Sequence, residues 1–162
     1  MAGTIIGMLG HCPEADDVGQ ETFIRFYQSL DKFRGESSVG TYLTRIATNL
    51  SLNELKRRQQ KRGHFFSRTE QGMENFAEKN KQKQRKELKN IVHTGIQKLD
   101  PKYRTVIVLR LIDGYSTREV AQILKIPVGT VLSRLARAQM KLKEILTPLY
   151  WDRNDSRGEG NG

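Results

Sequence analysis

The sequence is poor in the residues that build disulfide frameworks, metal centres and membrane spans. Cys12 is the single cysteine among 162 residues, so no internal disulfide can form and no thiolate cluster is present for zinc. The three histidines, His11, His64 and His93, are scattered. No apolar run approaches the roughly 20 residues of a membrane-spanning helix, and residues 4–9 lack the basic flank of a signal peptide. We therefore expect a cytoplasmic protein with no metal site and no membrane insertion.

Motifs of catalysis are missing as well. The sequence contains neither a glycine-rich phosphate-binding loop nor a serine nucleophile elbow. The histidines are too dispersed to suggest an acid–base pair. An enzyme is therefore the least expected class, and no cofactor is predicted.

Acidic residues are outnumbered by basic ones. The 28 lysines and arginines exceed the 18 aspartates and glutamates, which gives a formal net charge of +10. This excess favours an anionic partner such as nucleic acid, because lysines and arginines release counterions when they bind phosphates. Membrane surfaces and acidic proteins would satisfy the same charge, and so would solubility alone.

What the sequence does contain is apolar residues at helical spacing, in two separate blocks. In the first block, which runs to about residue 62, the expected core positions are Phe23, Phe26, Tyr27 and Leu30, followed by Val39, Tyr42, Leu43, Ile46, Ala47 and Leu50. In the second block they are Leu88, Ile91, Val92, Ile96 and Leu99, followed by Tyr103, Val106, Ile107 and Leu111. No strand-like alternation is found, so we predict an all-α fold with two small helical bundles joined by a flexible linker.

The predicted divisions are a first domain at 1–62, a linker at 63–86, a second domain at 87–147 and a disordered tail at 148–162. Each bundle is small enough to be only marginally stable alone, so a partner is expected to share the stabilisation. Within the first domain, a glycine breaks the helical pattern in the segment 32–38, and either Ser37 or Ser38 can cap the next helix.

The second domain contains a predicted helix-turn-helix. Ser116 and Glu119 form a capping box at the start of a short helix, which Pro127 and its neighbours end. Thr130 is expected to cap a second helix. The inward positions of the two helices are Val120, Ala121 and Leu124, then Val131, Leu135, Ala138 and Leu142. Two helices joined by such a tight turn are typical of this motif.

The outward side of that second helix is basic. Ser133, Arg134, Arg137 and Lys141 project along nearly one line, which suits a helix lying in the DNA major groove. Arginine can bond guanine edges bidentately, and lysine and hydroxyl groups can contact phosphates or bases. A solvated basic face on an ordinary helix hairpin would show the same spacing, so this pattern alone leaves both interpretations open.

Residues 114–138, GYSTREVAQILKIPVGTVLSRLARA, closely resemble the promoter-reading module of extracytoplasmic-function (ECF) sigma factors in the sigma-70 family. Three upstream stretches resemble the family's other domain in the expected order: DDVGQETF at 16–23, FRGESS at 33–38 and YLTRIATN at 42–49. The resemblance covers most of residues 14–147. It implies a sigma factor that directs core RNA polymerase to specific promoters, the first domain melting the minus-10 element and the second binding the minus-35 element.

The resemblance also implies roles for particular residues. Asp17, Gln20 and Glu21 match the surface that binds the clamp of RNA polymerase, where carboxylates would pair with arginines. A solvated acidic face would look the same. The implied minus-35 contacts are Thr130, Ser133, Arg134, Arg137 and Lys141.

The implied minus-10 contacts are Arg34, Ser37, Tyr42, Asn49, Asn53, Lys56, Arg57 and Arg58. Small polar groups beside an aromatic ring suit a base flipped from the duplex, which needs edge hydrogen bonds and a wall. Spacing alone equally allows Ser37 to cap a helix and Asn49 to bond nearby backbone. A basic helix end is also common as compensation of the helix dipole.

Three features depart from the family pattern. Only about a dozen residues precede the acidic motif, where the family usually has a longer helix, so the first bundle is expected to be short or completed by another chain. Tyr42 stands at a position where tryptophan is usual in the family. The side chain is still aromatic, but its ring offers a smaller surface to an unpaired base. Leu132 replaces a usual basic residue, which should remove a DNA contact and shift promoter preference.

The expected partners are core RNA polymerase, promoter DNA and an anti-sigma factor, because such a protein covers the same surfaces in many relatives. The family's linker runs near the polymerase active centre, a route that the basic residues 79–86 would tolerate. The alternative is a stand-alone helix-turn-helix regulator that binds a palindromic site as a dimer. The first domain favours a sigma factor, since a regulator has no use for the acidic helix, the 33–38 loop and Asn49 in this order.

Overall fold

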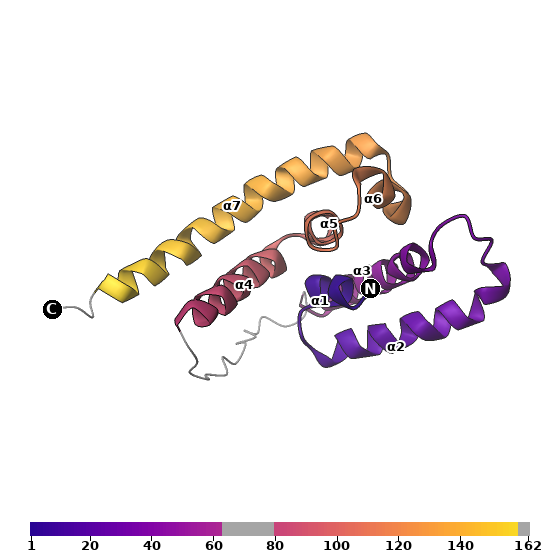
Figure 1. Cartoon of the computed structure of the whole chain (residues 1–162), viewed down its shortest axis with the longest axis horizontal. Helices are drawn as coiled ribbons and strands as arrows, with labels where there is room; N and C mark the ends of the chain where they lie inside the picture. The colour runs from indigo at the N-terminus through magenta and orange to yellow at the C-terminus, as the bar shows by residue number, and fades with distance from the viewer. Residues whose placement is uncertain (63–79, 159–162) are drawn as a thin grey trace.

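The structure, a computed structural model, describes residues 1–62 and 80–158 (Figure 1). All regular elements in these two ranges are helical. They are α1 (Ala2–Leu9), α2 (Pro13–Gln28), η1 (Leu30–Lys32), α3 (Val39–Arg62), α4 (Asn80–Lys98), α5 (Pro101–Ile107), η2 (Val108–Ile112), α6 (Thr117–Leu124) and α7 (Val128–Gly158). The predicted all-α fold is confirmed, and the domain boundaries stay predictions.

In the amino-terminal half, α2 and α3 lie side by side and α1 packs on both (Figure 1). α1 ends at Gly10, whose φ of 81° is a conformation that glycine adopts without strain. Pro13 occupies the first turn of α2, where its missing N–H costs nothing. Two short-range features of the sequence therefore set the sharp turn between α1 and α2.

The buried face of α2 is not the predicted one. Ala15, Val18 and Thr22 are buried, whereas the positions predicted for the core are exposed at Phe23, Tyr27 and Leu30. Helical periodicity identifies the helix, but α2 carries two candidate stripes and periodicity cannot say which one meets a neighbour. In α3 the prediction holds for Ala47 and Leu50, which are buried, and is wrong for Val39, which is exposed.

In the carboxyl-terminal half, Ile96, Leu99, Tyr103, Val106 and Ile107 are buried as predicted. Three further positions predicted for the core are exposed, namely Leu88, Val92 and Leu111. η2 is a π-helical turn that continues α5, and its Val108 and Leu109 are fully buried. This half therefore has a compact apolar centre on α5 and η2.

Two segments that the sequence predicts without regular structure are helical. α4 begins at Asn80, so residues 80–86 of the predicted linker are helical, and residues 63–79 lie outside the described part. α7 continues through Pro148 to Gly158, so the predicted disordered tail is helical up to that residue, and residues 159–162 again lie outside. Polar composition argues against burial but is compatible with a solvent-exposed helix, which accounts for both helical segments.

The predicted capping box and turn are confirmed. Ser116 Oγ accepts a hydrogen bond from the Glu119 N–H at 3.3 Å, and Glu119 Oε2 accepts one from the Ser116 N–H at 2.7 Å. Lys125 has a left-handed φ of 53°, and the next N–H closes the end of α6 by bonding back to Ala121. The cap of α7 differs from the prediction, because the carbonyl of Pro127 accepts the first bonds and Thr130 lies inside the helix.

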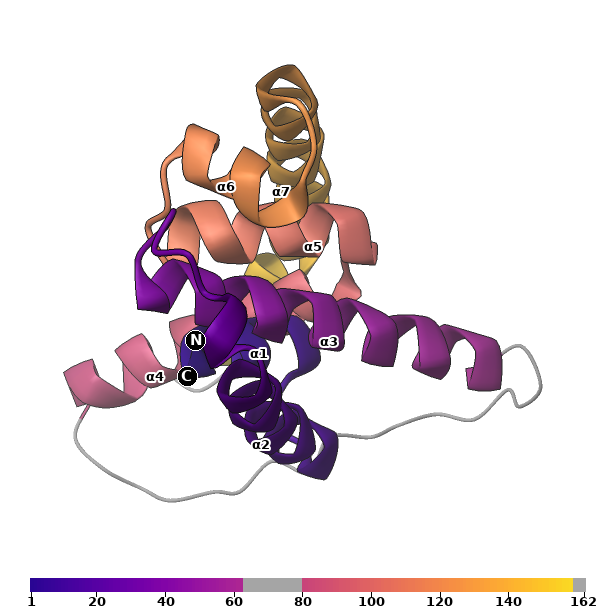
Figure 2. The same ribbon diagram turned by 90° about the vertical axis from the view of Figure 1, so that its right-hand side faces the viewer.

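The two halves of the chain are in contact and share one hydrophobic core. Figure 2 shows α5 and α6 on one side of α3, and α1 contacts both α3 and the carboxyl-terminal elements η2, α4 and α5. Ile5 and Met8 of α1 are buried in this shared core together with Val108 of η2. No helix within residues 1–62 and 80–158 is long and apolar enough to cross a lipid bilayer.

Candidate nucleic-acid interface

The second helix of the helix-turn-helix is held by its apolar side. Val131 and Ala138 of α7 are fully buried, which fixes the orientation of the helix. The side next to this buried stripe presents the predicted minus-35 residues, of which Ser133, Arg137 and Lys141 are exposed and Thr130 and Arg134 are half-buried. The structure therefore brings all five onto one side of α7.

Most of these groups are available for a ligand. Neither Arg134 nor Arg137 makes a hydrogen bond or an ion pair among the side chains that the structure describes. Lys141 is partly engaged, because its Nζ lies 5.7 Å from the centroid of the Tyr103 ring. Leu132 is 53% exposed beside this basic line.

The predicted minus-10 residues of α3 form a second line. Their side chains share one face of the helix, because consecutive members are separated by about one or two helical turns. They are Tyr42, Asn49, Asn53 and Lys56. Asn49, Asn53 and Lys56 are exposed. Tyr42 is half-buried, with its ring 6.1 Å from that of Phe26 and 5.2 Å from that of Phe33, centroid to centroid.

The loop before α3 carries Arg34, which is exposed, and Ser37, which is half-buried. The structure decides which serine caps the helix. Ser38 Oγ accepts a hydrogen bond from the Thr41 N–H at 3.1 Å. Ser37 is therefore not needed as the cap of α3.

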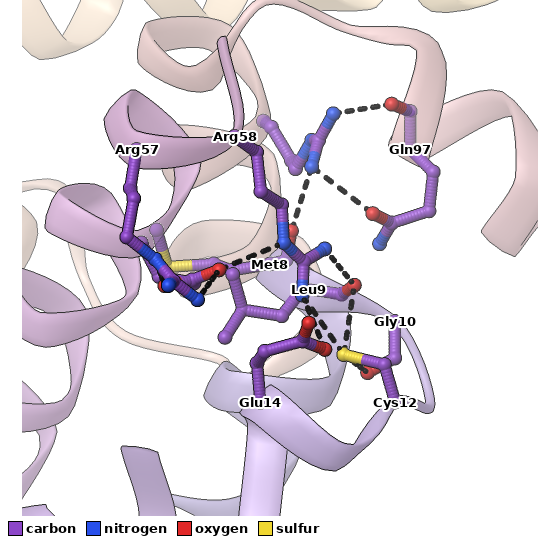
Figure 3. Close-up of polar contacts among 10 residues, drawn as sticks. Met8, Leu9, Gly10, Cys12, Glu14, Arg57, Arg58 and Gln97 are labelled. Carbon is purple, nitrogen blue, oxygen red and sulfur yellow. Dashed lines mark hydrogen bonds and ion pairs between the residues drawn. The ribbon is translucent and has the colours of Figure 1, made fainter. Parts of the chain in front are cut away.

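Arg57 and Arg58 differ sharply in what they contact. The Arg57 guanidinium is half-exposed and makes two hydrogen bonds to Glu54, at 2.7 and 3.0 Å. Arg58 points the other way and bonds four groups, which Figure 3 shows together: Glu54 at 3.1 Å, the Leu9 carbonyl at 3.1 Å, Cys12 Sγ at 3.0 Å and Glu14 at 3.3 Å. Arg58 thus lies apart from the other minus-10 residues and holds the α1–α2 turn against α3.

These arginines also set the charge state of Glu54. Hydrogen bonds from Arg57 and then Arg58 outweigh the partial burial of Glu54 and lower the pKa of its carboxyl below the ordinary 4.5. Glu54 is consequently ionised at neutral pH and neutralises part of the basic end of α3.

The predicted clamp residues lie on an exposed side of α2. Asp17 and Gln20 are exposed, and Glu21 forms an ion pair with Arg25 at 2.6 Å. Sequence reasoning missed their apolar neighbours, because Ile24 and Tyr27 share this face of the helix and are 51% and 77% exposed. Their positions one and two turns after Gln20 place them on this face, although the helical spacing of the apolar residues predicts Tyr27 in the core.

The minus-10 and minus-35 lines meet at one cavity of about 430 Å³. Lys56 of α3 and Arg134 of α7 both line it, and Lys102 at the start of α5 adds a third cation. The remaining lining residues are Leu52, Gln59, Asp100, Pro101, Thr105 and Leu124. Residues predicted to contact two separate DNA elements are therefore neighbours in this structure.

Comparison with known proteins gives two family matches in chain order. The Sigma-70 region 2 family matches residues 3–61, and the Sigma-70, region 4 family matches residues 89–142. The ECF RNA polymerase sigma factor SigW of Bacillus subtilis is 38% identical over 152 residues, which are 88% of this chain and 80% of that protein.

Two solved structures are similar in fold. The sigma factor RpoE of Bartonella quintana, in complex with the anti-sigma factor NepR, matches with a TM-score of 0.67 and 22% identity over 90% of this chain and 88% of that one. CnrH, in complex with the cytosolic domain of CnrY, matches with a TM-score of 0.63 and 30% identity over 90% and 79%. The chain therefore belongs to the extracytoplasmic-function sigma factors of the sigma-70 family.

Proposed function

We propose that the protein is an RNA polymerase sigma factor that directs core polymerase to specific promoters. The observation that carries this proposal is the presence of both halves in one chain, each with a polar or basic line on the exposed side of a long helix. A stand-alone regulator would use only the carboxyl-terminal half. Catalysis of RNA synthesis belongs to the polymerase, so the protein acts in the cytoplasm as a specificity subunit rather than as an enzyme.

The minus-35 element is assigned to Thr130, Ser133, Arg134, Arg137 and Lys141 of α7. Arg134 and Arg137 have the strongest support, because their guanidinium groups are unpaired among the described side chains and lie at the amino-terminal part of the second helix. This part of a helix-turn-helix usually contacts base edges. Lys141 lies a turn further on and suits a phosphate.

The minus-10 element is assigned to Arg34, Ser37, Tyr42, Asn49, Asn53, Lys56 and Arg57. Phe26 and Phe33 brace the Tyr42 ring, which supports its role as a wall for an unpaired base. Arg58 is left out of this set because its guanidinium is already bonded within the protein.

The polymerase clamp is assigned to Asp17, Gln20 and Glu21, together with Ile24 and Tyr27. Exposed apolar side chains beside carboxylates form a surface of mixed character, as protein–protein contacts require. An anti-sigma factor is the expected regulator, and the related CnrH is known in complex with the cytosolic domain of CnrY.

The proposal is tested by mixing the purified chain with bacterial core RNA polymerase on a sizing column and then assaying transcription from random promoter fragments. Co-elution together with new, specific transcripts supports a sigma factor. DNA binding without co-elution would instead support a stand-alone regulator. Bovine albumin in place of core polymerase controls for nonspecific association of this basic chain.

A further inference from the structure

The cavity bounded by α3, α5 and α7 carries more positive charge than its own walls neutralise. Lys56, Lys102 and Arg134 line it, against the single carboxylate of Asp100. None of these three cations forms an ion pair with a side chain that the structure describes. Cations that line one small space repel each other, so an anion that enters the cavity is attracted by all three.

A fourth cation lies beside this cavity, at the ring of Tyr103. Lys102 Nζ lies 5.0 Å from the centroid of that ring, and Lys141 Nζ of α7 lies 5.7 Å from it. The ring itself is largely buried, because Tyr103 is 6% exposed. Lysines of α5 and α7 therefore approach one aromatic ring, which extends the positive potential of the cavity along α7.

The walls of the cavity differ in chemistry and in burial. The side chains that are exposed are all charged or polar, namely Lys56, Gln59, Asp100 and Lys102. The half-buried ones are mostly apolar, namely Leu52, Pro101 and Leu124, with Arg134 among them. A half-buried guanidinium without an acceptor has lost hydration and gained no hydrogen bond in return. The cavity thus suits a ligand that has an anionic part and an apolar part.

The size of the cavity limits the ligand to a small molecule. Its volume of about 430 Å³ lies within the range of about 300–1,000 Å³ that is usual for small-molecule sites. A sphere of this volume is about 9 Å across, whereas the major groove of DNA alone is about 12 Å wide. A promoter duplex can pass over the exposed side of the cavity but cannot fill it.

We propose that this cavity binds a nucleoside di- or triphosphate. The phosphates match Lys56, Lys102 and Arg134, since lysine and arginine are the usual side-chain partners of phosphate groups. The base covers the apolar wall, which phosphate alone would leave in contact with water. Gln59 and Asp100 supply hydrogen-bonding groups for the ribose or the edge of the base.

A nucleotide in this cavity would occupy cations that the proposed function assigns to DNA. Lys56 belongs to the proposed minus-10 contacts and Arg134 to the proposed minus-35 contacts, whereas Lys102 belongs to neither. Nucleotide and promoter DNA should therefore compete, which would make promoter binding sensitive to nucleotide concentration. This consequence rests on the proposed sigma-factor function, but the binding site itself does not.

Isothermal titration calorimetry of the full chain tests the site in the absence of polymerase and DNA. ATP and GTP are titrated separately in about 0.15 M salt with EDTA, where a Debye length of about 8 Å screens diffuse attraction to a basic protein. We expect one nucleotide per chain, bound at least about tenfold more tightly than inorganic pyrophosphate, and no binding of adenosine. If neither triphosphate binds, or if pyrophosphate binds as tightly as the better of the two, the proposal is wrong.

A pair of lysine variants locates the binding. Lys102→Gln removes one cation of the cavity without disturbing the fold, because this side chain is exposed. Lys143→Gln removes the same charge from an exposed position of α7 outside the cavity and is the matched control. We expect Lys102→Gln to weaken nucleotide binding at least about tenfold and Lys143→Gln to leave it nearly unchanged. Equal losses would show a response to overall charge and would contradict a site in the cavity.

Competition with DNA is measured by fluorescence anisotropy on a promoter duplex selected with the parent protein. The better-bound nucleotide should weaken DNA binding by the parent, and sulfate at the same ionic strength controls for screening. The same nucleotide should have little effect on DNA binding by Lys102→Gln. Equal effects on the two proteins would contradict competition at this cavity. A parent that binds nucleotide but no promoter DNA contradicts the proposed function instead and supports the site.

Discussion

Arg58 shows how neighbouring residues of one type can have different functions. It follows Arg57 directly, but its side chain bonds the Leu9 carbonyl, Cys12 and Glu14, whereas Arg57 bonds Glu54 alone among the described residues. At about 100° per residue, Arg58 lies on the side of α3 opposite Asn49. The sequence therefore contained enough information to separate Arg58 from the DNA-facing residues, but not to say what it would bind.

Replacing Arg58 with alanine should lower the free energy of unfolding by about 1–3 kcal/mol, because buried acceptors lose their donor. Arg57→Ala removes a half-exposed ion pair and should cost less than about 1 kcal/mol. Urea denaturation of the two variants measures the difference. Equal losses would mean that Arg58 does not hold the α1–α2 turn.

The stability of the protein should fall with pH in the acid range because of Glu54. Its pKa in the folded state lies below the ordinary 4.5 through the bonds from Arg57 and Arg58, so ionised Glu54 stabilises the fold above pH 4.5. That stability is lost as the pH falls from 4.5 through the lower folded-state pKa. Urea midpoints measured between pH 7 and pH 3 should decline less steeply for Glu54→Gln, and parallel curves would contradict this role.

Arg134 and Arg137 should account for much of the affinity of α7 for the minus-35 element. Replacing both with alanine should weaken binding by about 1–3 kcal/mol for each bidentate base contact that is lost, and should also reduce the slope of log affinity against log salt, because two cations are removed from the DNA surface. Fluorescence anisotropy on a promoter duplex at several salt concentrations gives both values. Arg85→Ala, an exposed arginine on α4, is the control and should leave the slope unchanged.

At the scale of elements, helices were predictable and their orientations were not. The capping box at Ser116 and the turn at Pro127 follow from local chemistry, and both are present. The phase of α2 depends on which face meets α3, a contact between segments far apart in the sequence. The helical structure of residues 80–86 and 148–158 could not be predicted from composition, because polar residues form solvent-exposed helices as readily as loops.

The exposed face of α2 carries a prediction of its own. Asp17→Lys with Glu21→Lys reverses the charge of the proposed clamp surface and should weaken polymerase binding by at least about tenfold. Secondary structure should be unchanged, since neither side chain is buried. Competition with the parent protein for core polymerase measures the loss, with Glu144→Lys on α7 as the control for added positive charge. Undiminished competition would show that α2 is not the clamp surface.

At the scale of the whole molecule, the contact between the two halves was beyond sequence reasoning. The spacing of apolar residues predicts that each block is a separate helical unit. This spacing does not indicate that α1 bonds to Gln97 and Arg104. The buried residues Ile5 and Met8 of α1 lie in the core that the two halves share.

The most direct test of the central claim is mapping of transcript start sites. Core polymerase is incubated with the protein and a library of random promoter fragments, and the 5′ ends of the transcripts are sequenced. The proposed function predicts start sites that share two upstream elements at a fixed separation, absent with core polymerase alone and lost in the Arg134→Ala, Arg137→Ala variant. Start sites that match those of core polymerase alone would contradict assignment as a sigma factor.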